Sequence, residues 1–229
     1  MRVVVLPGMD GGADLSAAFR AELPSAIESL GVEYPVDEAL GYDELEGLVR
    51  DELSRSSAPT VLLAESFSGP IAVRIGAAPP VNLIGVLLVA SFVESPVPAA
   101  LRHLVGSYLF WAPPPRALVR RFMLDDAASD AVLADVISAI GRVRPRVLAA
   151  RARAIMTVDA RAELGRITLP LRYLEARHDR LVAVREGLVR CRPDLDLQVI
   201  DAPHLVLASR PTAAARALEA FIGTIRSTE

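Results

Sequence analysis

The chain has 229 residues, of which 52% are hydrophobic and 23% charged, a composition that fits a globular domain with a large core and excludes a disordered chain. Its formal net charge of −3 excludes the strongly basic balance of a typical nucleic-acid-binding domain. The apolar stretch after Arg2 ends at Pro7, which is too short for a secretory signal. No apolar run approaches the roughly 20 residues of a membrane-spanning helix, so we expect a cytoplasmic protein.

The first part of the chain alternates between expected strands and helices. Apolar runs predict buried strands at 2–6, 31–36, 61–64 and 82–90. Segments with apolar residues on one face predict helices at 14–23, at 42–54 and after residue 69. This alternation favours an α/β fold, in which a parallel sheet carries helices on both faces.

The pattern changes between residues 92 and 166, where no strand is predicted. Helices are expected at 99–110, 116–124, 129–140 and 145–158. We expect residues 92–166 to form a helical cap over the carboxyl ends of the strands, because ligands bind there in such sheets. The alternative is that these helices are additional scaffold on one face of the sheet.

The strand pattern then resumes. Strands are expected at 169–175 and 196–201, and helices at 184–191 and 211–225. The sheet-forming core domain would therefore consist of residues 1–91 and 167–229, with the cap inserted before the last two strands.

A candidate nucleophile lies in the stretch Thr60–Pro70, TVLLAESFSGP. A strand that turns sharply into a helix with Ser66 at the apex is a nucleophile elbow. The usual pattern is G-x-S-x-G, and here Ala64 and Ser68 stand at the two glycine positions. Both are small, as the close approach of strand and helix requires. Ser68 fits less well as the nucleophile, because Pro70 follows two positions later.

A serine hydroxyl needs a base to remove its proton. The chain has three histidines. His103 lies in an expected cap helix and His178 at a strand end, where each has an ordinary structural explanation. His204 directly follows the last expected strand, and its loop is free to place the ring over Ser66. We therefore predict His204 as the base.

The base in turn needs an acid that orients its ring. Asp179 follows the preceding expected strand and is the favoured acid. Glu175 and Asp201 are the competitors, although both also fit solvated strand ends. The order Ser66, Asp179, His204 is the order found in α/β-hydrolases.

The glycine-rich loop at residues 7–12, PGMDGG, follows the first expected strand. It matches neither the dinucleotide-binding nor the P-loop pattern. It could turn a backbone N–H toward the nucleophile, or it could be an ordinary turn. We find no cofactor motif and no cluster of Cys and His for a metal.

Four motifs, LPGMDG, AESFSGPIA, LEARHDRLV and DAPHLVLASRP, together resemble the α/β-hydrolase superfamily. They are most similar to the compact bacterial branch that includes the pimeloyl-carrier-protein methyl ester esterases. The resemblance implies a mostly parallel, six-stranded sheet and a serine hydrolase that forms an acyl-enzyme. It also implies an oxyanion hole made by the backbone N–H groups of Met9 and Phe67. Pro7 stands where the family usually has His.

The resemblance favours hydrolysis of a carboxylic ester or thioester. Acyl transfer on the same triad, or a binding module without catalysis, stays open. In the cap, apolar side chains that include Leu101, Val105 and Tyr108 are expected to line an acyl pocket. Five arginines without an intervening acid could form a solvated face or attract an anionic partner, such as a substrate carboxylate or an acyl-carrier protein: Arg142, Arg144, Arg146, Arg151 and Arg153.

Overall fold

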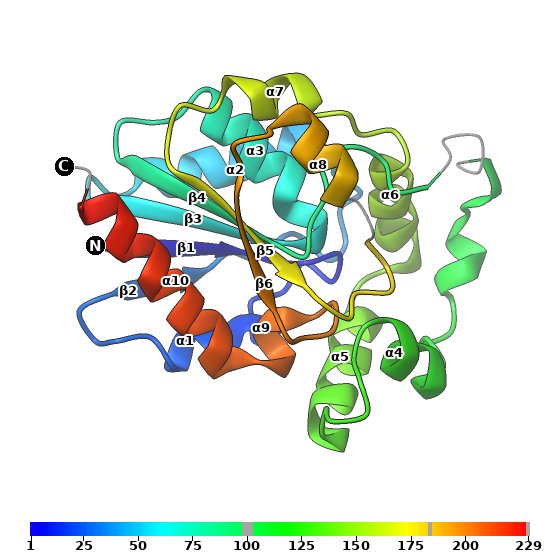
Figure 1. The fold of residues 1–229 in the computed structure, drawn as a ribbon. Helices are drawn as coiled ribbons and strands as arrows, with labels where there is room; N and C mark the ends of the chain where they lie inside the picture. Colours follow the sequence, from blue (N-terminus) through cyan, green and yellow to red (C-terminus); the bar gives the residue numbers. More distant parts are fainter. Residues whose placement is uncertain (98–102, 183–184, 228–229) are drawn as a thin grey trace.

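A six-stranded sheet, all of whose strands run parallel, forms the centre of the protein (Figure 1). The structure, a computed structural model, describes residues 1–97, 103–182 and 185–227. The strand order is β2-β1-β3-β4-β5-β6, which confirms the predicted α/β fold and its six strands. The strands are β1 (Arg2–Leu6), β2 (Glu28–Gly31), β3 (Thr60–Glu65), β4 (Leu83–Val89), β5 (Leu171–Ala176) and β6 (Asp196–Ile200).

Helices cover both faces of the sheet because the central strands are apolar on both sides. In β1, Val4 and Leu6 belong to the core cluster on one face, while Val3 and Val5 belong to the cluster on the other. The first face is covered by α2 (Tyr42–Ser54), α3 (Gly69–Ala77), α7 (Arg161–Arg166) and α8 (Arg185–Cys191). The second is covered by α1 (Ala17–Ala21), α9 (Val206–Ser209) and α10 (Pro211–Arg226).

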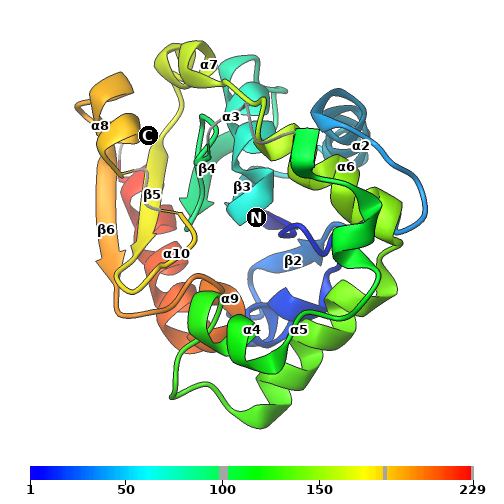
Figure 2. The same cartoon turned by 90° about the vertical axis from the view of Figure 1, so that its right-hand side faces the viewer.

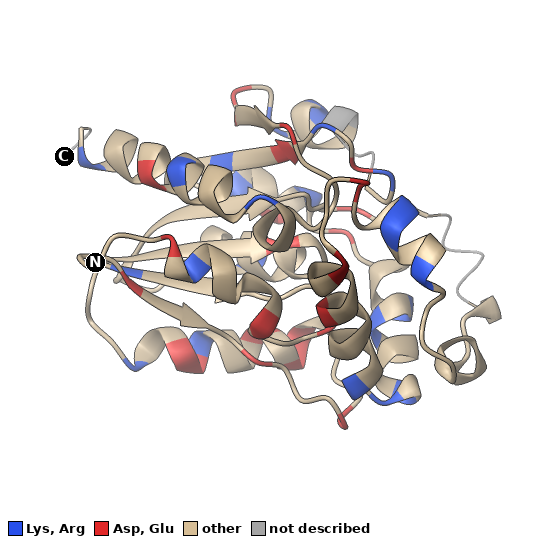
Figure 3. Cartoon of the chain, turned by 90° about the horizontal axis from the view of Figure 1, so that it is seen from below, with Lys and Arg blue, Asp and Glu red and all other residues tan. Residues whose placement is uncertain are grey.

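The chain between β4 and β5 places three helices beyond the carboxyl ends of the strands (Figure 2). These are α4 (Arg116–Phe122), α5 (Asp130–Arg142) and α6 (Pro145–Ile155), preceded by the 3-10 helix η4 (Ser107–Phe110). An antiparallel bridge between Glu94 and Asp159 joins the start and the end of this segment between β4 and β5. Helices α4 and α6 carry arginines and no acidic residue, whereas α5 carries both signs. Figure 3 shows acidic and basic residues spread over the chain.

The division into a core domain and a cap at residues 92–166 stays a prediction. The structure adds that α7, inside the expected cap range, packs against α3 on a face of the sheet. The expected helix at 99–110 falls partly on residues 98–102, which lie outside the described residues. Within the described part of the chain, no helix combines the length and the apolar character needed to cross a membrane.

The predicted position of the second strand was wrong. We expected residues 31–36, but β2 pairs with β1 through Glu28–Gly31. The apolar residues that suggested a strand, Val32 and Tyr34, are buried beyond the end of that pairing. There the Tyr34 amide donates to the main-chain oxygen of Gly11, so this segment packs against the glycine-rich loop.

Candidate active site

Ser66 stands at the sharp turn between β3 and α3. Its φ angle is 52°, in the left-handed region that non-glycine residues rarely adopt and that costs about 1–3 kcal/mol. The hydroxyl of Ser91, at the end of β4, donates to the main-chain oxygen of Ser66. A Cβ atom at Gly69 would lie 1.7 Å from the Ser91 oxygen. A glycine is therefore needed at position 69, where α3 begins.

A continuous chain of hydrogen bonds runs from Ser66 to Asp179. Ser66 Oγ lies 2.8 Å from His204 Nε2, and His204 Nδ1 lies 2.7 Å from Asp179 Oδ2. The side chains of His204 and Asp179 are only 3% and 6% exposed, so water competes little for these bonds. The loops after β3, β5 and β6 thus bring the three expected residues together at the carboxyl ends of the strands.

The other oxygen of the Asp179 carboxylate is also held. Asp179 Oδ1 accepts hydrogen bonds from the amides of Leu181 and Val182, at 2.8 and 2.9 Å. Both carboxylate oxygens therefore have partners, which fixes the direction in which the carboxylate meets the imidazole.

The structure places the competing residues elsewhere. His178 Nε2 lies 2.7 Å from Asp201 Oδ1, and both side chains are largely exposed. Glu175 lies within β5. His103 is exposed.

The glycine-rich loop at residues 7–12 lies beside Ser66. Met9 and Ser66 line the same cavity, and Gly11 has a φ of 75°, which a glycine adopts without strain. The loop closes on itself, since the Gly11 amide donates to Gly8 and the Gly12 amide to the carboxylate of Asp10. Burial raises the pKa of that Asp10 carboxyl.

Arg151, from α6, anchors this loop. Its side chain is 1% exposed, and it donates to the main-chain oxygens of Met9 and Pro35, each at 2.9 Å. A Cβ at Gly11 would lie 2.5 Å from the guanidinium, so the second glycine of the loop leaves room for it. Burial lowers the pKa of Arg151.

Sequence reasoning missed this role of Arg151 and grouped it with four neighbouring arginines. One signal was present, because Arg151 lies four positions from both Val147 and Ile155, on the apolar face of its helix. The others differ from it. Arg142 pairs with Asp14 at 2.6 Å, while Arg144 is exposed, and Arg146 and Arg153 donate to main-chain oxygens of Asp37 and Val105.

Glu65, which precedes Ser66, was also not singled out. Its carboxylate accepts a hydrogen bond from the amide of Leu207 at 3.0 Å. The side chain is buried, and desolvation raises its pKa from 4.5 to about 7. The end of the strand that carries Ser66 is thereby tied to the segment that follows His204.

An apolar cavity of about 230 Å³ opens onto Ser66 and His204. Its lining comes from the glycine-rich loop, the segments after β4 and β5, and the helices beyond the strand ends. The apolar members are Met9, Leu15, Phe92, Pro96, Met123, Val136, Ile140, Ile155, Leu181, Val182 and Leu205. Among the described residues, no three His, Cys, Asp or Glu side chains are placed to hold a metal ion.

Of the expected acyl-pocket residues, Val105 and Tyr108 do not line this cavity. Tyr108 is 59% exposed and donates its hydroxyl to the main chain of Leu104. Val105 is half-buried and accepts a hydrogen bond from Arg153 through its main-chain oxygen. Leu101 lies outside the described residues.

Comparison with protein-family models and with curated proteins finds no match. Solved structures do match over nearly the whole chain. The enol-lactonase from Burkholderia xenovorans LB400 has a TM-score of 0.81 at 17% identity, covering 97% of this chain and 91% of that one. A bromoperoxidase from Bacillus anthracis has a TM-score of 0.83 at 14% identity, with the same coverage. A thermophilic esterase from Thermogutta terrifontis has a TM-score of 0.80 at 19% identity, covering 98% and 90%.

The chain has the α/β-hydrolase fold. In this fold the usual elbow has glycines where Ala64 and Ser68 stand here. Ala64 is fully buried in the sheet, which a methyl group permits. Ser68 is also buried, and its hydroxyl donates to the main-chain oxygen of Pro7 and lies 2.8 Å from the Tyr34 hydroxyl. The serine at position 68 therefore links the elbow to the glycine-rich loop of this α/β-hydrolase fold.

Proposed function

We propose that the protein is a serine hydrolase that cleaves a carboxylic ester or thioester through an acyl-enzyme. The observation that carries this proposal is the chain of hydrogen bonds from Ser66 through His204 to Asp179, at 2.8 and 2.7 Å, beside an apolar cavity. A binding module would not need a buried base held between a hydroxyl and a carboxylate.

In this mechanism Ser66 Oγ attacks the carbonyl carbon while His204 Nε2 accepts the hydroxyl proton. Asp179 orients the ring and stabilises the imidazolium that forms. The negative charge on the carbonyl oxygen would be stabilised by the backbone N–H groups of Phe67 and Met9. His204 then returns the proton to the departing alcohol or thiol. Water, deprotonated by the same ring, releases the acid and regenerates Ser66.

The cavity supports an apolar group on the substrate. Its lining is mostly apolar, and the polar side chains that line it are Ser66, His204 and Asp10. The enol-lactonase and esterase among the similar structures agree with ester chemistry. The similar bromoperoxidase shows why the site, rather than the fold, must carry the proposal.

The test is the rate of hydrolysis of a short p-nitrophenyl ester by the purified protein. Ser66→Ala and His204→Ala should each reduce kcat by about 10⁴-fold or more, and the double variant should be no worse, because triad residues act as a unit. His178→Ala is the matched control, since that ring is exposed and pairs with Asp201. Turnover that persists in Ser66→Ala would overturn the proposal.

A further inference from the structure

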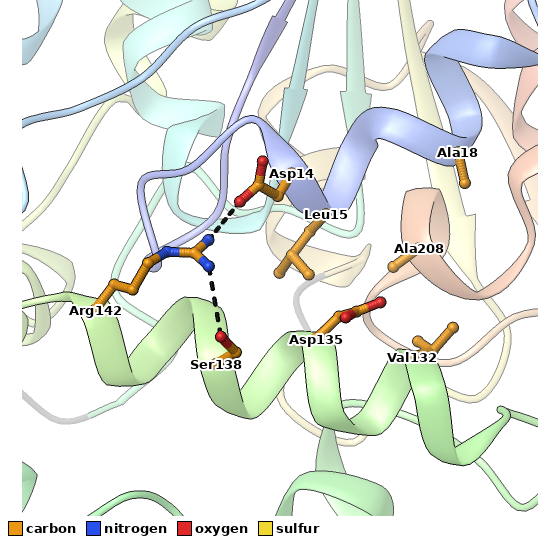
Figure 4. A pocket seen from close by; sticks show the side chains of 8 residues that line it. All are labelled: Asp14, Leu15, Ala18, Val132, Asp135, Ser138, Arg142 and Ala208. Carbon is orange, nitrogen blue, oxygen red and sulfur yellow. Dashed lines mark hydrogen bonds and ion pairs between the residues drawn. The ribbon is translucent and has the colours of Figure 1, made fainter.

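Two cavities share a single side chain. The catalytic cavity of about 230 Å³ is lined by Ser66, His204 and Leu15. A second cavity of about 270 Å³ also has Leu15 in its lining, but no member of the triad. In Figure 4 the Leu15 side chain points toward α5. The other residues that line the second cavity are Asp14, Ala18, Val132, Asp135, Ser138, Arg142 and Ala208.

Both cavities follow the same helix. Val136 and Ile140 of α5 line the catalytic cavity, and Val132, one turn earlier, lines the second. Asp135, Ser138 and Arg142 of α5 also line the second cavity, so the two spaces lie side by side along this helix, on neighbouring strips of its surface. Leu15 lies opposite this helix, is 9% exposed, and packs in the same apolar cluster as Val136.

We propose that Leu15 is a specificity-determining residue, whose side chain separates the two cavities and limits the length of the apolar chain that the substrate can place beside Ser66. This inference rests on the proposed ester hydrolysis and adds a substrate class to it: esters with a short chain. A longer chain would have to displace Leu15 from its apolar cluster.

The second cavity could take such a chain once Leu15 is shortened. Ala18, Val132 and Ala208 present small or aliphatic side chains to it. Arg142 pairs with Asp14, and these side chains are 49% and 69% exposed. Asp135 lies apart from this pair, closer to Val132 (Figure 4), and is also exposed. These charged side chains keep contact with water, so an alkyl chain along Ala18 and Val132 need not desolvate them fully.

The experiment compares the wild type with Leu15→Ala on straight-chain p-nitrophenyl esters from acetate to dodecanoate. The wild-type kcat/KM should stop rising at a short chain, whereas that of Leu15→Ala should continue to rise with longer ones. Each further methylene buried should add about a fourfold increase, the equivalent of about 0.8 kcal/mol. Ala18→Leu in the Leu15→Ala background refills the second cavity and should return the short-chain profile.

Two controls separate this effect from damage to the fold. Leu53→Ala truncates a fully buried leucine of α2 that lines neither cavity, and should lower the melting temperature without changing the chain-length profile. Calorimetric titration with straight-chain alcohols needs no turnover. The affinity for the alcohol should rise with the length of its alkyl chain, and it should stop rising at a longer chain in Leu15→Ala than in the wild type.

Failure of the inference about Leu15 and failure of the proposed ester hydrolysis would give different results. A wild-type profile in folded Leu15→Ala, by turnover and by alcohol binding, would overturn the inference while leaving ester hydrolysis intact. A longer-chain profile that Ala18→Leu fails to reverse would also overturn it, because the added space would not then be the second cavity. Wild-type protein without ester turnover would contradict the proposed function, and the alcohol titration would still decide the role of Leu15.

Discussion

The guanidinium group of Arg151 donates a hydrogen bond to the main-chain oxygen of Met9, 2.9 Å away, across 142 positions of the sequence. The residue whose N–H would supply one half of the proposed oxyanion hole is thus held, through its carbonyl group, from α6, a helix beyond the ends of the strands. The same side chain also holds Pro35. The position of the loop therefore depends on this helix.

We predict that Arg151→Gln weakens both the fold and the proposed catalysis. It removes charged donors from two main-chain oxygens, and hydrogen bonds to charged groups are worth about 1.5–3 kcal/mol each. The free energy of unfolding should fall by roughly 3 kcal/mol, measured by urea titration. If the displaced Met9 amide is an oxyanion donor, kcat should fall by about 10²-fold with a smaller change in KM.

Arg153→Gln is the matched control for this prediction. Arg153 lies on the same helix, but it is exposed and donates to Val105 rather than to the loop. Its substitution should change stability by about 0.5 kcal/mol or less and leave kcat unchanged. Equal effects of the two substitutions would show that Arg151 acts only through the charge of the helix.

The contrast between Arg151 and Ser66 shows which parts of the site the sequence could reveal. Ser66, Asp179 and His204 each follow an expected strand, and the carboxyl ends of parallel strands meet at one edge of a sheet. The order of strands and helices along the sequence was therefore enough to predict that these three residues lie close together. The contact of Arg151 with Met9 depends on how α6 packs, which no local pattern encodes.

The pocket residues illustrate the same limit. Val105 and Tyr108 were expected in the pocket as apolar side chains of the cap, yet Tyr108 lies on the surface. The cavity instead takes Val136 and Ile140 from α5 and Leu15 from the core. The position of β2 was similarly missed because an edge strand is fixed by its register with β1, and the more apolar residues after it are buried by other contacts.

The acid of the triad gives a second prediction. Asp179→Asn should reduce kcat by roughly 10³–10⁴-fold, because the amide cannot stabilise the imidazolium or hold the required tautomer. Asp201→Asn should have little effect, since Asp201 contacts the exposed His178. Steady-state ester hydrolysis by both variants measures the difference, and a larger loss in Asp201→Asn would transfer the role of the acid to that residue.

We predict that Glu65 makes the free energy of unfolding depend on pH. Burial raises its pKa from 4.5 to about 7, so between these values the folded protein holds a proton that the unfolded chain releases. The free energy of unfolding should therefore fall as the pH rises through this interval and level off above it. Glu65→Gln removes the titrating group, and its stability relative to the wild type should rise by about 3 kcal/mol across the same interval.

Urea unfolding at several pH values, from about 4 to about 8, tests this linkage. Glu22→Gln is the control, because it removes an exposed carboxyl. It measures how the loss of one negative charge alone changes the free energy of unfolding. A constant stability difference between Glu65→Gln and the wild type at every pH would show that Glu65 stays ionised in the folded protein.

Covalent labelling tests most directly whether Ser66 is an activated nucleophile. The native protein is incubated with a fluorophosphonate, and the intact mass and the modified peptide are determined. We predict a single phosphonyl group on Ser66, much slower labelling in His204→Ala, and none in Ser66→Ala. A native protein that stays unlabelled, or a label that persists in Ser66→Ala, would contradict the account.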